Sequence, residues 1–161
     1  MEKRYAVYQT TIGNMVIAEA DGAVTEVFTG TDFPLSFRAQ EEETPLTAQA
    51  ARQMREYLRG ERQVFTLPLN PQGTVFQLSV WNALAQIPYG QTRSYKDIAV
   101  AIGNPKAMRA VGMANHNNPI SFIIPCHRVI GADGSLVGYG GGLGLKKKLL
   151  DLEREVLLKN T

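Results

Sequence analysis

Cys126 and His127 stand side by side in the segment Pro125–Val129, and Cys126 is the only cysteine among 161 residues. A single cysteine cannot form an internal disulfide, and no second thiol is available for a thiolate metal site. The thiol is therefore either an inert buried side chain or a nucleophile. A nucleophilic thiol attacks as the thiolate, so it needs a nearby base or positive charge that lowers its pKa.

The residues before Cys126 predict how the thiol is presented. Apolar side chains occupy Ile120 and 122–124, and Pro125 biases Ile124 toward extended geometry. We therefore expect Cys126 at the end of a buried, extended segment. Neighbouring side chains of a flat strand point to opposite faces, so His127 could serve Cys126 only if the chain turns there or a water relays the proton.

A pair of short helices is predicted upstream of the cysteine. The capping-box pattern Ser94-x-x-Asp97 opens a helix over 95–102. Asn104 is a favoured N-cap residue and a proline follows it, so a second helix is predicted over 105–114. Two short helices joined by a turn that contains glycine resemble a helix-turn-helix, although many such pairs only pack together.

The predicted second helix combines small side chains with one long cation. Met108 and Val111 are expected to face the core, while Arg109 projects from the surface. Such a helix suits close approach to a DNA groove, where an arginine can enter the base stack. Tight helix packing beside an ordinary surface arginine is the alternative. The small residues are Ala107, Ala110, Gly112 and Ala114.

The remaining pattern predicts two domains, 1–70 and 71–161, separated by a linker-like stretch at 68–73. The first is β-rich with one helix, and the second opens with a helix that Thr74 caps. The expected elements of the first domain are strands at Tyr5–Gln9, Met15–Ala20, Ala23–Phe28 and Gln63–Leu67, and a helix at Thr47–Leu58.

Composition is that of an ordinary globular protein, with 44% hydrophobic and 20% charged residues. No apolar run approaches the roughly 18 residues of a membrane span, and the N-terminus lacks a secretory signal. A single free thiol fits a reducing compartment, so we expect a cytoplasmic protein. Residues 1–90 carry a net charge of −3 and residues 91–161 a net charge of +5. This asymmetry points weakly to a polyanionic partner, and an ordinary solvated surface explains it almost as well.

The segment 118–130, NPISFIIPCHRVI, resembles the active-site signature of O6-alkylguanine-DNA alkyltransferases. The resemblance runs almost continuously over residues 73–155, whereas residues 1–70 resemble that family only as a small, ribonuclease-H-like β domain. Further matching positions are Gly73-Thr74-x-Phe76-Gln77-x-x-Val80-Trp81, Ile87–Gly90, Ser94-Tyr95, Arg109–Gly112, Gly138-Tyr139-x-Gly141-Gly142, Lys146, Leu149-Leu150 and Glu153.

The resemblance implies an α/β protein that repairs alkylated double-stranded DNA directly. Cys126 would displace the alkyl group from O6 of guanine, and also from O4 of thymine, in an in-line reaction that leaves a stable S-alkylcysteine. Each molecule would act once, without a cofactor and without a metal. A monomer is implied, with cooperative binding along DNA as a further option, and no membrane is involved.

The resemblance also implies catalytic roles for four partners of Cys126. His127 would take the thiol proton through a water, and Glu153 would orient the imidazole. Asn118 would brace the turn that carries the cysteine, and Tyr95 would donate toward N3 of the base. Taken alone, Glu153 could be a surface glutamate, Asn118 a turn residue and Tyr95 a tyrosine at the edge of the core.

Substrate and DNA contacts are implied in the same way. The Gly140 amide would donate to O6 beside Gly141, Tyr139 would form a wall of the pocket, and the main chain near Val129 would read the exocyclic amine. Arg109 would fill the position that the rotated nucleotide vacates. The other implied DNA contacts are Tyr95, Lys106, Ala107, Ala110, Gly112 and Arg128.

The sequence departs from the family pattern at three places. His116 and Lys96 stand where glycine is common, and His116 would either strain its turn or contact a phosphate. The run 146–148 is three lysines, interpreted as a solvated helix face or as a phosphate-attracting surface. Two other functions remain open, a non-catalytic binder of damaged DNA and a thiol hydrolase that ignores DNA.

Overall fold

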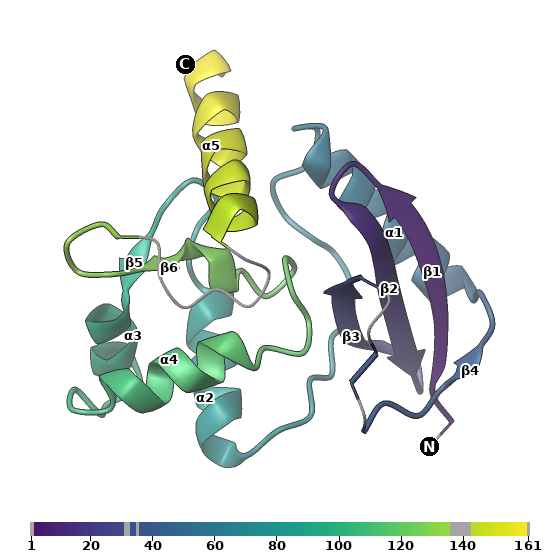
Figure 1. Cartoon of the computed structure of the whole chain (residues 1–161), viewed down its shortest axis with the longest axis horizontal. Coiled ribbons are helices and arrows are strands. Elements are labelled where there is room, and N and C mark those ends of the chain that lie inside the picture. The colour runs from purple at the N-terminus through teal and green to yellow at the C-terminus, as the bar shows by residue number, and fades with distance from the viewer. Residues whose placement is uncertain (1, 31–32, 35, 136–142, 161) are drawn as a thin grey trace. The chain divides into compact units, whose positions relative to one another are not determined.

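The computed structural model describes residues 2–30, 33–34, 36–135 and 143–160 (Figure 1). The chain divides into two compact units, Met1–Gln72 and Gly73–Thr161. The expected architecture, a small sheet domain followed by a mainly helical one, is confirmed.

The first unit is a four-stranded sheet in the order β3-β2-β1-β4 (Figure 1). The three long strands form an antiparallel meander, and β4 pairs in parallel with β1. The turn between β2 and β3 is Asp21-Gly22, whose φ angles of 52° and 80° are the positive values that a tight hairpin favours. The strands are β1 (Arg4–Thr10), β2 (Gly13–Ala20), β3 (Ala23–Thr29) and β4 (Gln40–Glu41).

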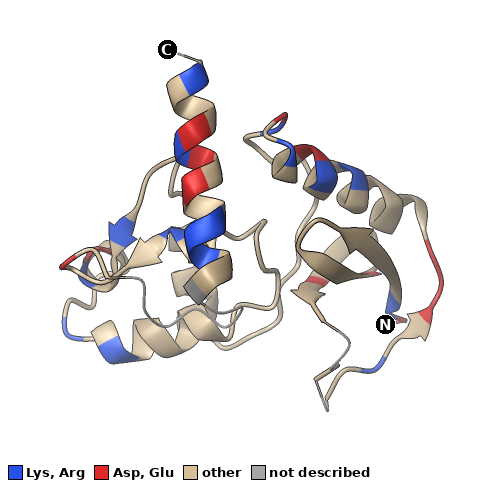
Figure 2. Ribbon diagram, turned by 45° about the horizontal axis from the view of Figure 1, so that its top comes forward, with Lys and Arg blue, Asp and Glu red and all other residues tan. Residues whose placement is uncertain are grey.

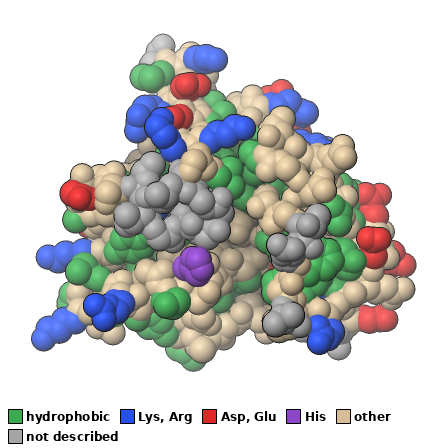
Figure 3. All heavy atoms as spheres, in the orientation of Figure 1, with side chains coloured by type: hydrophobic (Ala, Val, Ile, Leu, Met, Phe, Trp, Pro, Cys, Tyr) green, Lys and Arg blue, Asp and Glu red, His purple; other side chains and the backbone are tan. Residues whose placement is uncertain are grey.

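Helix α1 (Pro45–Leu58) packs on this sheet. Thr44 and Thr47 form a reciprocal capping box at its N-terminus, and Met54 and Tyr57 are fully buried beneath it. Four aromatic rings of this unit contact one another edge to face. They belong to Tyr5, Phe28, Phe33 and Phe37. Acidic side chains gather along the edge of this unit that carries β4 (Figure 3).

The strand predicted at Gln63–Leu67 is wrong. The Thr66 amide donates to the side chain of Gln53 at 3.0 Å, so it is not available to a neighbouring strand. The chain meets the sheet only later, where Val24 donates to the Pro68 carbonyl and accepts from the Asn70 amide, both at 2.8 Å. A proline in this stretch also removes one donor from any ladder.

In the described part of the second unit there are four α-helices, one short 3₁₀ helix and a pair of two-residue strands. The indole Nε1 of Trp81 on α2 donates to the Ala114 carbonyl on α4 at 2.8 Å, which fixes these two helices together. The parallel pair β5·β6 ties the start of α3 to the chain that follows Cys126. These elements are α2 (Val75–Ala85), β5 (Arg93–Ser94), α3 (Tyr95–Ala101), α4 (Met108–His116), β6 (Val129–Ile130) and α5 (Leu143–Lys159).

Helix α3 begins with the predicted capping box, but α4 begins three residues later than predicted. The Ala107 amide donates to the Asn104 carbonyl at 3.0 Å, so residues 104–107 form a turn with Pro105 in its second position. Asn104 is therefore not the N-cap. Met108 is 47% exposed, which contradicts its expected place in the core, whereas Val111 is buried as predicted.

Candidate active site

The chain turns sharply at Cys126, and the expected extended segment before it is wrong. The Ile123 amide donates to the Ser121 carbonyl and the Cys126 amide to the Ile124 carbonyl, both at 2.8 Å. A short 3₁₀ helix, Cys126–Arg128, follows at once. His127 could serve Cys126 only if the chain turned here or a water relayed the proton, and the first of these two conditions is met.

Two buried asparagines hold the turn. The amide group of Asn118 donates to the Ile124 carbonyl at 2.8 Å, and its oxygen accepts from the Ile120 amide at 3.0 Å. Asn118 also makes a hydrogen bond with the Cys126 side chain. Asn115, near the end of α4, donates to the Cys126 carbonyl at 3.4 Å. Helix α4 and Cys126 are thereby linked through the Asn115 side chain.

Glu153 on α5 is fully buried and accepts hydrogen bonds from the main chain and from neighbouring side chains. Nε2 of His127 lies 2.7 Å from its Oε2, and the Gly90 amide donates to its Oε1 at 2.9 Å. Arg128 completes the set through Nε at 2.9 Å and Nη2 at 3.0 Å. Burial raises the pKa of the Glu153 carboxyl, but the hydrogen bonds from His127 and Arg128 outweigh it and lower that pKa to about 2.

Arg128 points into the protein. It is 7% exposed, its Nη1 donates to the Ile87 carbonyl at 2.8 Å, and its guanidinium lies over the Tyr89 ring at 5.5 Å. A side chain held in this way cannot reach a phosphate without breaking the Glu153 pair. The structure therefore gives Arg128 an internal role in place of the DNA contact expected from the sequence.

The thiol of Cys126 is 4% exposed, and burial raises its pKa. The hydrogen bond with Asn118, the charge of Lys146 and two backbone amides act in the opposite direction. Burial also lowers the pKa of His127, against the effect of Glu153, so its imidazole is neutral near pH 7. A neutral imidazole can accept a proton.

Lys146 on α5 is fully buried and donates through Nζ to the Val129 carbonyl. Burial lowers its pKa to about 8, and the neighbouring Cys126 acts against that shift. Both interpretations of the lysine run are thus wrong for this residue, although Lys147 and Lys148 are exposed. Lys146, Leu149 and Glu153 share one buried helical face at positions i, i+3 and i+7, and that spacing is the signal that could have identified Lys146.

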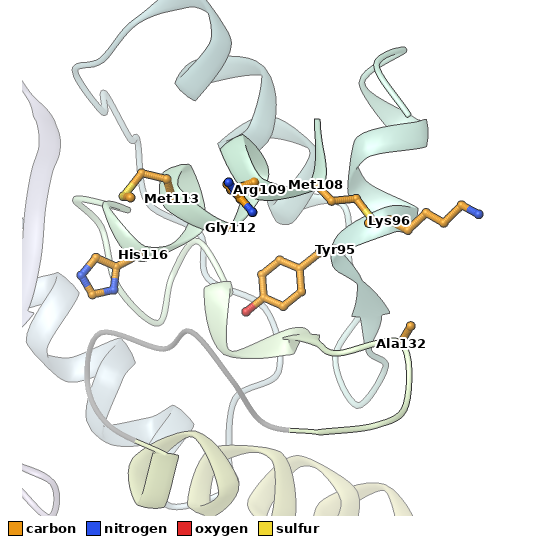
Figure 4. Close-up of a pocket in the computed structure, with 8 residues that line it drawn as sticks. All are labelled: Tyr95, Lys96, Met108, Arg109, Gly112, Met113, His116 and Ala132. Carbon is orange, nitrogen blue, oxygen red and sulfur yellow. The ribbon is translucent and has the colours of Figure 1, made fainter. Parts of the chain in front are cut away.

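A pocket of about 770 Å³ lies between α3 and α4 (Figure 4). The side chains of Arg109 and Tyr95 lie at its centre, with Met113 and His116 at one end and Lys96 at the other. Burial raises the pKa of Tyr95, and the nearby Cys126 adds to the rise.

The remaining expected residues lie on α4, in the turn before it, or outside the described part of the chain. Arg109 and Ala110 are exposed, and Gly112 is half-buried. Helix α4 contains no lysine and no arginine other than Arg109 (Figure 2). His116 ends the helix, and its φ is not positive, so the expected strain at that residue is absent. Lys106 and Ala107 belong to the preceding turn. Tyr139, Gly140 and Gly141 lie outside the described residues.

The fold and the site define a class of protein with a small sheet unit and a helical unit. The helical unit places a single buried cysteine, flanked by a His–Glu pair, beside a helix-turn-helix with an exposed arginine. Among the described residues, no helix is long and apolar enough to cross a membrane.

Comparison with known proteins shows that the chain belongs to the 6-O-methylguanine DNA methyltransferase family. The ribonuclease-like domain of that family matches residues 3–71, and its DNA-binding domain matches residues 75–155. The resemblance inferred from the sequence is therefore confirmed. The activity that follows is methylated-DNA–protein-cysteine methyl transfer, a direct reversal of DNA damage.

Several relatives match nearly the whole chain. The constitutive methylated-DNA–protein-cysteine methyltransferase of Bacillus subtilis is 44% identical over 93% of this chain and 94% of its own length. The enzyme of the same name from Methanosarcina acetivorans is 48% identical over 92% and 97%. A crystal structure of Mycobacterium tuberculosis OGT in complex with DNA has a TM-score of 0.89 and 42% identity, covering 95% of this chain and 94% of that one.

Proposed function

We propose that this protein repairs O6-alkylguanine in double-stranded DNA by accepting the alkyl group on Sγ of Cys126. A bond forms between sulfur and the alkyl carbon while the bond from that carbon to O6 breaks. The thiol proton leaves through His127, and the guanine regains a proton from solvent. A thioether has no easy hydrolytic exit, so each molecule reacts once. The observation that carries this proposal is the buried Cys126 in its asparagine-braced turn beside the His127–Glu153 pair.

The electrostatics of the site support the proposed roles. His127 is neutral and can accept the thiol proton through a water, and Glu153 stabilises the imidazolium that results. Asn118 holds the turn and contacts the sulfur. Tyr95 keeps its hydroxyl proton because its pKa is raised, so it can donate to the base as negative charge builds there.

The exposed surface of the helix pair supports a DNA-binding role. Arg109 would fill the gap left by the rotated nucleotide, whose unstacking costs on the order of a few kcal/mol. Ala110 and Gly112 allow α4 to approach the minor groove closely, with Lys106 and Ala107 in the turn before it. The DNA complex of the Mycobacterium tuberculosis relative supports DNA as the partner.

The proposal also covers the parts of the reaction pocket that follow from the family resemblance. Tyr139, Gly140 and Gly141 would line the base pocket, and the main chain near Val129 would read the exocyclic amine. O4-alkylthymine would be a second substrate. We further propose that the units 1–70 and 71–161 act as separate domains of a cytoplasmic monomer, whose thiol needs a reducing compartment.

An intact-mass measurement tests the proposal. Protein mixed with a duplex that contains O6-methylguanine should gain one methyl group per molecule, and Cys126→Ser should gain none while still binding the duplex. A parallel duplex with O4-methylthymine tests the second substrate. Binding without any mass gain by the wild-type protein would indicate a non-catalytic lesion binder. Repeated turnover of thioesters without DNA would indicate a hydrolase.

A further inference from the structure

The backbone at Phe122 is strained, four residues before the nucleophile. Its φ is +73°, and the Ile123 amide donates across it to the Ser121 carbonyl at 2.8 Å. This is a three-residue γ-turn of the positive-φ kind, which is rare and strained. Among the described non-glycine residues only Asp21 shares a positive φ, and it lies in a hairpin turn that favours such angles. A bulky aromatic residue with positive φ is a true outlier.

The surrounding structure holds this conformation in place. The Phe122 side chain is 2% exposed, so its ring anchors the turn in the core. The Ile124 amide donates to the Ile120 carbonyl at 3.1 Å, and Asn118 bonds to the backbone of both residues. Strain that neighbouring contacts maintain so firmly is typical of functional sites.

A second γ-turn, of the opposite hand, follows at Pro125. Pro125 has φ −80° and ψ 67°, and the Cys126 amide donates across it to the Ile124 carbonyl at 2.8 Å. A hydrogen bond from the Phe122 backbone is one of the interactions that lower the pKa of Cys126 against the effect of burial.

We propose that Phe122 is a positioning residue whose left-handed backbone aims its amide N–H at Sγ of Cys126 and so stabilises the thiolate that attacks the alkyl carbon. This rests on the proposed role of Cys126 as alkyl acceptor. Burial disfavours the thiolate, and a donor fixed before the reaction offsets part of that cost without any rearrangement. Glycine would adopt this backbone without strain, but it would lose the ring that anchors the turn.

Replacement of one backbone atom tests the proposal. Substitution of Phe122 by phenyllactic acid, its α-hydroxy analogue, keeps the ring and replaces the amide N–H by an ester oxygen. We expect the rate of Cys126 alkylation by iodoacetamide near pH 7 to fall roughly tenfold, with the pH profile moved upward, because a hydrogen bond to a charged group is lost. The same substitution at Phe37, whose amide donates to the Pro34 carbonyl in the first unit, is the matched control and should leave the profile unmoved.

Phe122→Gly separates the amide from the ring. It keeps the N–H and permits the positive φ but removes the ring that anchors the turn, so the pH profile should move less than with the ester while the urea midpoint falls. A profile that moves as far with Phe122→Gly as with the ester would assign the effect to ring packing and overturn the proposal, as would an unmoved ester profile. These rates are measured without DNA, so failure of methyl transfer from O6-methylguanine DNA would count against the proposed function alone.

Discussion

At the scale of single residues, the thiol of Cys126 is under opposing influences. Burial raises its pKa, while Asn118, Lys146 and two backbone amides favour the thiolate. Because the net shift is upward, the free protein near pH 7 holds mainly the protonated thiol. The proton must therefore leave the thiol during the reaction, and some group must receive it.

His127→Ala tests whether His127 is the group that receives the thiol proton. The pKa of His127 is lowered by burial, so the imidazole stays neutral below the usual range of histidine and the wild-type rate should hold to mildly acidic pH. Loss of a general base costs about 10²-fold or more, so we expect transfer at pH 7 to fall by that factor and to recover as the pH rises. Single-turnover transfer measured against pH is the check, and a variant with the wild-type profile would exclude His127 as the base.

Glu153→Gln tests the buried charge cluster at the same scale. The substitution leaves the guanidinium of Arg128 inside the protein without its carboxylate, and breaking a buried pair costs about 3–5 kcal/mol. Urea unfolding at pH 7 should show a loss of that order. Glu155→Gln, the same change at an exposed position of α5, is the control and should remain close to the wild type.

At the scale of elements, α4 connects the DNA-facing surface to the nucleophile. Arg109 lies on its exposed face, while Asn115 near its end donates to the Cys126 carbonyl. The turn 104–107 sets where the helix begins, and the Trp81 hydrogen bond fixes its far end against α2. A displacement of this helix would therefore move the sulfur.

Arg109→Ala separates nucleotide rotation from chemistry. Without the Arg109 side chain, less of the free energy of unstacking the nucleotide is offset. Duplex repair should slow by about tenfold for each 1.4 kcal/mol that is no longer offset. Reaction with a free O6-alkylguanine base, which needs no rotation, should change little. Single-turnover rates on both substrates give the comparison, with Arg154→Ala on the exposed face of α5 as the control. Equal slowing on both substrates would remove the stack-filling role.

Sequence patterns predicted the elements that depend on local interactions. The turn at Asp21-Gly22, the helix cap at Thr74 and the capping box at Ser94 each depend on neighbouring residues, and all three are present in the structure. The start of α4 was misplaced because Asn104 and Pro105 suit a turn as well as they suit a cap.

The parts of the site that were missed depend on contacts distant in sequence. The sequence predicts exposed positions for Arg128 and Lys146, but distant partners such as the Glu153 carboxylate and the Val129 carbonyl hold them inside the protein. The left-handed backbone at Phe122 has no local signal, since residues that favour positive φ are small or polar. Tertiary packing imposes that conformation.

At the scale of the whole molecule, the charges of the site predict how stability depends on pH. The folded pKa values of His127 and Glu153 both lie below their ordinary values, so the unfolded chain binds more protons than the folded one in acid. The stability that His127 gives is lost below about pH 6.5. The part due to Glu153 is lost as the pH falls from 4.5 through about 2.

We therefore expect the free energy of unfolding to fall steadily as the pH is lowered from 7 to 3. Trp81 is the only tryptophan and lies in the second unit, so its fluorescence during urea titrations reports the unit that holds both groups. Glu153→Gln should remove the carboxyl's own part of the slope below pH 4.5, while the part near pH 6 remains because His127 loses a group that opposes the lowering of its pKa. An equally steep decline in that variant below pH 4.5 would mean that carboxyls elsewhere govern acid unfolding, and Glu155→Gln provides the reference profile.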